Sequence, residues 1–377
     1  MSDGQQKNMA LLLTGGGARA SYQVGVMKAI SEWYPRVHPS PFTIFCGTSA
    51  GAINATALAC YASSFRLGVK KLAWLWGRLH TNTVFSATPG GMISYLGRQG
   101  FARLQSGCEQ PPPFGLLNNR PLRELLNSVL NYRRLDNNIH HNHLKALAIT
   151  AASYRRGISV TFFQGDGDIP PWSRAKSVGE QTLINTEHLL ASSAIPLVFP
   201  ASKIGNDFYG DGSIHQLAPL RPGLKLGAEK MLIIDMATKP QIKPGGKLPP
   251  PGLATLGGHL MDAIFSDTMA ADLELLERTN DLIREIPDER AKELGLRTID
   301  TCHLSPSIPL EDFVPDNYCK MPAASRVFMK FLGISPKEDA SITSYLLFEP
   351  DYIKELMSLG YDDAHKNEQI LRNFLHL

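Results

Sequence analysis

The chain has 377 residues, 43% of them hydrophobic and 19% charged, which is the composition of a folded protein that buries a sizeable core. A net charge of +3 is too small to indicate a nucleic-acid-binding protein, although it would not repel an anionic membrane surface. The five cysteines form no C-x-x-C pair, which argues against a disulfide framework or a zinc site and favours buried free thiols.

The N-terminal end carries no pattern of an export signal. Its first residues are polar, and the apolar run from Met9 to Leu13 is too short for a signal-peptide core. The small-residue stretch over 44–62 contains Gly, Thr, Ser and Asn, so it is interpreted as strand, turn and helix rather than a membrane span. The cytoplasm is therefore the expected compartment, and peripheral contact with a membrane stays open.

Two strand–turn–helix units open the chain. A buried strand is predicted over 9–14 and, after three glycines, a helix from Ala18 that keeps its apolar positions on one face and ends at Pro35. A second apolar strand over 42–46 leads to Ser49 and into a helix of small residues. Two such units in succession are typical of a parallel α/β sheet.

The remaining elements are more widely spaced. Residues 77–120 combine glycines and prolines with apolar side chains, which predicts long loops. Beyond them, a helix is predicted over 121–130, strands over 144–150 and 158–163, a helix over 186–194 and a strand over 230–236. A linker rich in proline and glycine over 244–252 precedes a long amphipathic helix over 254–286, and the segment 341–364 is predicted as a strand followed by a helix.

The strongest local signal is Gly47-Thr48-Ser49-Ala50-Gly51, a G-x-S-x-G sequence between a strand and a helix. A nucleophile on such a sharp turn projects its hydroxyl out of the sheet, and the small flanking residues Gly47 and Gly51 avoid clashes. The helix start adds a positive field that favours developing negative charge. The alternative is an ordinary serine in a Gly-rich turn.

A second signal, Gly15-Gly16-Gly17-Ala18-Arg19-Ala20, also stands between a strand and a helix. It brings backbone N–H groups to a helix start, which suits either a dinucleotide pyrophosphate or a transition-state oxyanion. The dinucleotide hypothesis expects an acidic residue after the next strand, but that strand runs into Ser49. Because the first two turns of a parallel sheet can open on the same edge, an oxyanion hole is favoured over a dinucleotide site.

A serine nucleophile needs a proton acceptor, and the candidate is Asp211 in the sequence Gly210-Asp211-Gly212. An aspartate between glycines is also typical of a plain turn. None of the eleven histidines, His188 and His303 included, stands in a recognisable catalytic setting. His215 follows Asp211 by four residues, so a Ser–Asp–His set stays open as an alternative.

These motifs together resemble the four ordered signatures of the patatin-like phospholipases: the GGGAR turn, the GTSAG elbow, the block SSAIPLVFP over 192–200 and the DG turn at Asp211. The resemblance covers about residues 9–235. It implies a catalytic dyad without histidine, with Ser49 as nucleophile and Asp211 as general base. It also implies an oxyanion hole made by the backbone of Gly15, Gly16, Gly17, Ala18 and Arg19. The chain departs from the family pattern at Ala20 and Ser213, both small residues.

The resemblance implies an α/β fold: a three-layer α/β/α sandwich with a mainly parallel sheet over 9–240, and a mainly helical C-terminal extension over 253–377 packed on it. The implied activity is hydrolysis of carboxylic esters in phospholipids or lysophospholipids through an acyl-enzyme, with no metal and no cofactor. Two alternatives stay open, a transacylase with the same acyl-enzyme and a non-catalytic lipid-binding module. A lipid is the only partner implied; no nucleic acid and no protein partner is indicated.

Several residues keep two interpretations. Arg19 either orients the oxyanion turn or attracts phosphate, or it is a solvated residue of the first helical turn. The basic pairs at 70–71, 133–134 and 155–156 are interpreted as solvated faces, with attraction to anionic headgroups as the alternative. The apolar loops from Phe85 to Phe101 either line an acyl-chain cleft, enter a bilayer interface or pack in an ordinary way.

Overall fold

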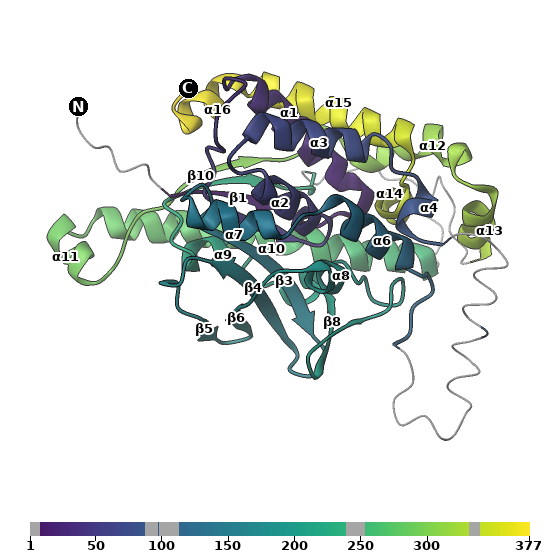
Figure 1. Cartoon of the computed structure of the whole chain (residues 1–377), viewed down its shortest axis with the longest axis horizontal. Helices are drawn as coiled ribbons and strands as arrows, with labels where there is room; N and C mark the ends of the chain where they lie inside the picture. The colour runs from purple at the N-terminus through teal and green to yellow at the C-terminus, as the bar shows by residue number, and fades with distance from the viewer. Residues whose placement is uncertain (1–7, 87–96, 98–112, 239–252, 332–339) are drawn as a thin grey trace, which may run out of the picture.

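The computed structural model describes residues 8–86, 97, 113–238, 253–331 and 340–377; within these ranges the side chains of 253–267, Ala324, Phe328 and Phe331 are not described. The linker predicted over 244–252 and most of the loop from Phe85 to Phe101 lie outside the described residues. A mixed, mostly parallel sheet lies between helices on both faces, which confirms the predicted three-layer α/β/α architecture (Figure 1). Of the described helices, none is long and apolar enough to cross a membrane.

The described strands form one sheet in the order β10-β9-β1-β2-β3-β4-β6-β5. Its parallel part comprises β1 (Met9–Leu13), β2 (Ile44–Thr48), β3 (Ala146–Ser153), β9 (Lys230–Ile234) and β10 (Asp300–Leu304). Beyond β3 the sheet continues through β4 (Ile158–Gly165), β6 (Ser177–Gln181) and β5 (Trp172–Arg174). Strand β4 is antiparallel to β3, β6 is parallel to β4, and β5 is antiparallel to β6. The hairpin of β7 (Ser202–Ile204) and β8 (Asp207–Asp211) joins β3 through β8.

Alternate side chains of β1 enter two separate cores, one on each face of the sheet. Leu11 and Leu13 pack beneath the helices α1 (Ser21–Glu32), α2 (Ala50–Cys60), α3 (Phe65–Trp76) and α15 (Pro350–Lys366). Ala10 and Leu12 pack on the opposite face with α9 (Arg221–Lys225) and α10 (Leu253–Arg284). A central strand buried on both faces has no polar side, which explains the continuous apolar sequence of β1.

Shorter helices complete the layers. Besides α9, the described short helices before β9 are α4 (Thr81–Val84), α6 (Arg120–Val129), α7 (Arg133–His140), α8 (Thr186–Ser192) and the 3-10 helices η1 (Gly17–Ala20) and η2 (Gly212–His215). Those after it are α11 (Asp288–Glu293), η3 (Leu310–Phe313), α12 (Val314–Asn317), η4 (Tyr318–Lys320), α13 (Ala323–Phe331), α14 (Ala340–Leu346) and α16 (Glu368–Leu375).

The C-terminal part is built into the same body. Strand β10 extends the sheet beside β9, and α15 lies along α1 (Figure 1). The two helix backbones approach closely: a Cβ on Gly25 would lie 1.9 Å from the carbonyl oxygen of Met357, and one on Gly360 would lie 2.2 Å from that of Tyr22. The first and last thirds of the chain therefore share one core, and the predicted domain boundaries stay a prediction.

One predicted element is wrong. The start of the segment 341–364 was expected to be a strand because Ile342, Thr343 and Tyr345 favour β structure, but it forms the helix α14. Tertiary contacts override that propensity, since this segment packs against η1, α10 and η3. Strand β10 was not predicted, because its sequence DTCHL alternates too weakly to stand out.

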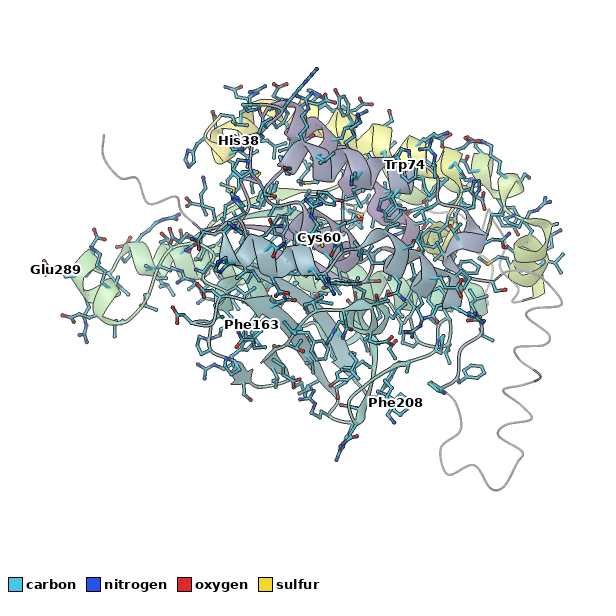
Figure 2. The ribbon with its side chains drawn as sticks, in the orientation of Figure 1. His38, Cys60, Trp74, Phe163, Phe208 and Glu289 are labelled. Carbon is cyan, nitrogen blue, oxygen red and sulfur yellow. The ribbon has the colours of Figure 1, made fainter. Side chains whose placement is uncertain are left out.

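The described cysteines are free thiols, and Cys108 lies outside the described residues. Cys46, Cys60 and Cys302 are buried as expected, whereas Cys319 is exposed. Figure 2 shows Cys60 inside the helical layer and Trp74 at the outer surface of the molecule. Burial raises the pKa of Cys46 and of Cys60 to about 12, so neither thiol is reactive at neutral pH.

Candidate active site

Strand β2 delivers Ser49 to the first turn of α2. Ser49 has φ 54° and ψ −128°, a backbone conformation that costs energy for a residue with a Cβ. The turn is also crowded: a Cβ on Gly51 would lie 2.3 Å from the carbonyl oxygen of Leu13, and one on Gly47 would lie 2.5 Å from Cα of Ala52. The two glycines therefore allow the sharp strand-to-helix turn that the G-x-S-x-G sequence predicted.

The hydroxyl of Ser192 connects the turn at Ser49 to strand β3. The amide of Ser49 donates to Ser192 Oγ at 2.8 Å, and that hydroxyl donates to the carbonyl of Thr150 at 2.6 Å. Ser192 is fully buried at the end of α8. No role was predicted for Ser192 from the sequence, although a serine in an otherwise apolar helix end was an available signal.

The register of the sheet brings Asp211 to Ser49. Strand β4 occupies one edge of β3 over its whole length, so the other edge carries both β2 and β8. Strand β2 ends with Thr48 opposite Thr150, and the antiparallel β8 ends with Asp211 opposite the next residue, Ala151. The C-terminal ends of β2 and β8 therefore meet, which places the two predicted catalytic side chains together.

The carboxyl of Asp211 is buried, with 1% of the residue exposed. Its Oδ1 accepts the amide of Ser213 at 3.0 Å, whereas no hydrogen bond of ordinary length reaches Oδ2. Burial raises the pKa of Asp211 to about 6, against the lowering effect of hydrogen bonds from Ser213 and from the Ser49 hydroxyl. The Ser49 hydroxyl is thus close to the carboxyl, although no hydrogen bond of ordinary geometry holds it to Oδ2.

The three histidines named in the sequence analysis take no part in this pair within the described structure. His215 is half-buried, and no hydrogen bond joins it to Asp211 or Ser49. His188 accepts the amide of Asn185 at the start of α8, and burial lowers its pKa to about 4. His303 is partly exposed and faces Asp235 at 3.6 Å.

The Gly-rich turn lies beside the serine, since Gly17 and Ser49 line the same cavity. Gly17 has φ 54°, and a Cβ there would lie 2.2 Å from the carbonyl oxygen of Tyr345. It begins the 3-10 helix η1, whose first amides have no carbonyl within the helix to bond. The amide of Arg19 is different because it donates to Gly16 O at 3.0 Å. The amides of Gly17 and Ala18 are therefore the better candidates for oxyanion donors.

Of the interpretations of Arg19 that the sequence left open, a solvated residue is wrong, because only 5% of it is exposed. Its Nε donates to Ser344 Oγ at 2.5 Å, and the guanidinium lies 4.1 Å from the ring centroid of Tyr345. Glu311 adds a carboxylate at 3.6 Å. The guanidinium is thus held by α14 and η3 rather than presented to a phosphate, and it fixes the Gly-rich turn to the C-terminal part.

A chain of buried amides supports the other side of that turn. Gln23 Nε2 donates to the carbonyl of Thr14 at 2.9 Å. Asn54 Nδ2 donates to Gln23 Oε1 at 2.9 Å and to the carbonyl of Ala20 at 3.1 Å. Trp76 Nε1 donates to Asn54 Oδ1 at 2.8 Å. The residues on both ends of the Gly-rich turn are therefore connected to Trp76, which lines the cavity.

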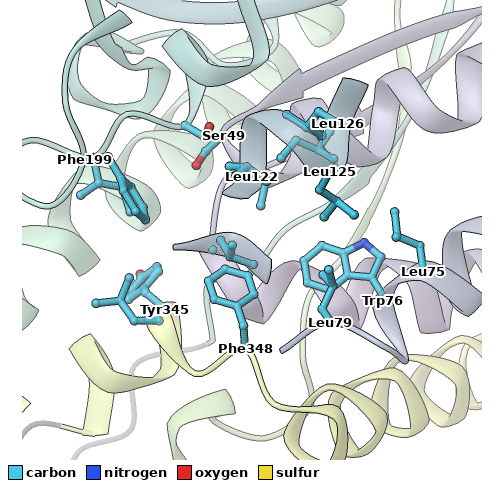
Figure 3. A pocket seen from close by; sticks show the side chains of 17 residues that line it. Ser49, Leu75, Trp76, Leu79, Leu122, Leu125, Leu126, Phe199, Tyr345 and Phe348 are labelled. Atoms are coloured by element: carbon cyan, nitrogen blue, oxygen red, sulfur yellow. The ribbon is translucent and has the colours of Figure 1, made fainter. Parts of the chain in front are cut away.

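The cavity in front of Ser49 is almost entirely apolar. Its walls come from α2, α3, α4, α6, the segment that follows α8 and the segment around α14, and they include Leu75, Trp76, Leu122, Leu125, Phe199 and Phe348 (Figure 3). The volume of the cavity is only about 60 Å³. The cavity suits a narrow hydrocarbon chain that carries a polar group at the end next to Ser49.

The fold and site define a class: a three-layer α/β protein with a serine on a strained strand-to-helix turn, a buried carboxylate beside it and a Gly-rich turn in front. The family model described as patatin-like phospholipase matches residues 11–224. The chain therefore belongs to the patatin-like phospholipase family, within the lipid hydrolases.

Solved structures similar to this chain include VipD from Legionella pneumophila, at 12% identity and a TM-score of 0.37 over 98% of this chain and 67% of VipD. The type III effector protein ExoU is similar at 13% identity and a TM-score of 0.32, over 92% of this chain and 53% of ExoU. ExoU in complex with SpcU from Pseudomonas aeruginosa gives 15% identity and a TM-score of 0.27, over 90% and 70%. None of the curated proteins compared with the chain matches it significantly.

Proposed function

We propose that this protein is a serine lipid acyl hydrolase, with Ser49 as nucleophile and Asp211 as general base. The meeting of the ends of β2 and β8 supports this pairing, because the buried Asp211 at the end of β8 has one carboxylate oxygen without a hydrogen-bond partner. The apolar cavity supports an acyl chain as the group that binds next to it. The substrate class is therefore a carboxylic ester of a lipid.

The proposed reaction has two halves. Asp211 takes the Ser49 proton as Ser49 Oγ attacks the ester carbonyl, and amides of Gly17 and Ala18 stabilise the oxyanion, each good donor being worth about 3–4 kcal/mol. The intermediate collapses, the lipid alcohol leaves with the proton from Asp211, and the acyl group stays on Ser49. Water then attacks the acyl-enzyme with Asp211 again as base, and the fatty acid is released.

The raised pKa of Asp211 fits this role. A free aspartate is a weak base, with a pKa of about 3.9. At a pKa of about 6, Asp211 remains ionised at neutral pH and binds a proton more strongly. The same burial that raises the pKa also keeps water from competing for the serine proton, since Ser49 is only 2% exposed.

The low exposure of Ser49 also favours a second candidate, transfer of the acyl group to an alcohol instead of water. Both activities share the acyl-enzyme, so the acceptor alone distinguishes them. A site that restricts water slows the hydrolytic half, and an alcohol that binds in the cavity would then compete well.

The test is a panel of phospholipids, lysophospholipids and acylglycerols, with products identified by mass spectrometry, together with a soluble nitrophenyl ester. Ser49→Ala is expected to lower turnover by about 10⁴-fold or more while the protein stays folded. Ser128→Ala on the exposed side of α6 is the matched control and should keep full activity. Added acceptor alcohol reports transacylation. Hydrolysis that survives in Ser49→Ala, or no turnover of any ester by the wild type, contradicts the proposal.

A further inference from the structure

Helix α3 presents an apolar and basic outer face. Its inner side is buried through Phe65, Val69, Leu72 and Trp76, among others. On the outer side Trp74 is 59% exposed and Leu67 is 45% exposed. Exposed aromatic and aliphatic side chains on one helix face are a feature of interaction surfaces.

The charges on this face have one sign. Arg66, Lys70 and Lys71 lie on α3 and Arg78 follows it, while the helix sequence FRLGVKKLAWLW has no acidic residue. Within the described part of the chain these four cations take part in none of the ion pairs.

Aromatic rings organise two of these cations. The Arg78 guanidinium lies 4.3 Å from the ring centroid of Trp74, and Lys71 Nζ donates to the hydroxyl of Tyr61 at 2.8 Å. Cations held beside aromatic rings and outside the described ion pairs match a surface that is anionic outside and apolar beneath.

A groove beside α3 runs next to the cavity of Ser49. Trp74, Lys71 and Val129 line the groove, and Leu75 lines both the groove and the cavity. Helix α6 also contributes to both, through Leu125 in the cavity and Val129 in the groove. The two hollows therefore share the walls α3 and α6, with Leu75 between them.

We propose that this α3–α6 face, made by Arg66, Leu67, Lys70, Lys71, Trp74, Arg78 and Val129, docks the protein on an anionic lipid bilayer. Trp74 and Leu67 enter the boundary between headgroups and acyl chains, and the four cations face lipid phosphates. A lipid from the docked surface then passes Leu75 to reach Ser49; this last step rests on the proposed hydrolase function, whereas the docking does not.

A second copy of the chain is the other occupant that such a face could take. A two-fold dimer would bring the same patch of both copies together and place eight cations in one interface. Like charges at close range oppose that contact, so the charge pattern favours an anionic bilayer.

The test measures vesicle binding of the full chain in a Ser49→Ala background, so that no turnover alters the lipid. Co-sedimentation compares phosphatidylcholine vesicles with and without phosphatidylserine. Reversal of two charges, Lys70→Glu with Lys71→Glu, is expected to weaken binding to the anionic vesicles roughly tenfold or more, and Trp74→Ala severalfold. The matched control is Arg290→Glu with Lys292→Glu on the exposed helix α11, which should bind as before.

Three outcomes overturn the docking proposal: unchanged binding in the α3 variants, an equal loss in the α11 control, or a dimer that Trp74→Ala converts to monomer in sedimentation velocity without changing vesicle binding. A second measurement separates docking from catalysis. In the chain with Ser49 intact, the α3 variants should hydrolyse a soluble nitrophenyl ester at the wild-type rate but lose activity on vesicle lipid. If the chain is inactive on every ester but still binds vesicles through α3, the proposed function is contradicted and the docking proposal stands.

Discussion

The surroundings of the Asp211 carboxyl determine both its hydrogen bonding and its pKa. One carboxylate oxygen accepts the amide of Ser213, and the other, which has no hydrogen-bond partner, accepts the Ser49 proton in the proposed mechanism. Because the residue is buried, the fold favours the protonated carboxyl, and the pKa rises to about 6. A carboxyl with this pKa changes from protonated to ionised within the pH range of ordinary assays.

Activity should therefore rise with pH and reach a plateau. In the proposed mechanism only ionised Asp211 accepts the Ser49 proton, so kcat/KM on a soluble ester should increase through a midpoint of about 6 and stay level above it. His215→Ala should keep both the midpoint and the rate. Loss of the rising limb in His215→Ala would instead assign the base to histidine.

Stability should change in the opposite direction. The folded-state pKa of Asp211 lies above its unfolded value of 3.8, so its contribution to stability is complete at lower pH and is lost as pH rises to about 6. Two pKa units correspond to about 3 kcal/mol. Asp211→Asn removes this loss, so relative to wild type it should be more stable at pH 8 than at pH 4, as measured by urea unfolding. The exposed Asp168→Asn should show no such difference, and equal shifts in both variants would contradict the burial argument.

Single residues were predictable from sequence where local geometry dictates them. Ser49 and its glycines follow from a short strand-to-helix pattern, because a side chain at Gly47 or Gly51 would meet the backbone. The partners of Arg19 and the bond from Ser49 to Ser192 were not predictable, since they join residues 325 and 143 positions apart. Family resemblance connected Ser49 with Asp211 before the sheet register was known, and no spacing rule could have done so.

At the scale of elements, α8 and β3 hold the turn at Ser49 through one hydroxyl, that of Ser192. Ser192→Ala leaves the Ser49 amide and the Thr150 carbonyl without that partner, which should destabilise the fold by about 1–3 kcal/mol. A displaced nucleophile should lower kcat roughly 10–100-fold with little change in KM. Ser31→Ala, whose hydroxyl bonds only within α1, is the control for a buried serine. Unchanged kcat in Ser192→Ala contradicts this role.

Helix α6 should set the length of acyl chain that the cavity accepts. Leu125 lines the cavity and is half-buried, so Leu125→Trp should narrow it and reduce turnover of long-chain esters while short-chain esters react normally. Glu124→Trp adds the same bulk one residue away on the exposed side of the helix and should change neither. A uniform loss across all chain lengths in Leu125→Trp would argue against binding of the acyl chain here.

Elements with strong patterns were predictable, and short or polar ones were not. The strands that became β1, β2, β3, β4 and β9 were placed correctly because their apolar runs are bounded by turn residues. Strands β5, β7 and β8 are three to five residues long and largely polar, so their strand state depends on pairing with neighbours. The same dependence on tertiary contacts turned the expected strand at 341 into α14.

At the scale of the whole molecule, the close contact of α1 and α15 unites the two ends of the chain. A side chain at Gly360 would meet the backbone of α1, so Gly360→Ala should lower the free energy of unfolding by about 1–3 kcal/mol. Gly167→Ala is the control, because a Cβ there meets no atom within 4 Å. Urea unfolding measures the stability of both variants. If Gly360→Ala is as stable as Gly167→Ala, the close contact of α1 and α15 does not contribute to stability as expected.

The proposed function depends on Ser49 acting as a nucleophile that Asp211 activates. A long-chain alkyl fluorophosphonate, followed by peptide mass spectrometry, tests it directly because this reagent stays on the serine that attacks it. We expect one adduct, on Ser49, formed at the wild-type rate in His215→Ala and roughly a hundredfold or more slowly in Asp211→Asn. An adduct on another residue, or equal labelling rates in wild type and Asp211→Asn, would contradict it.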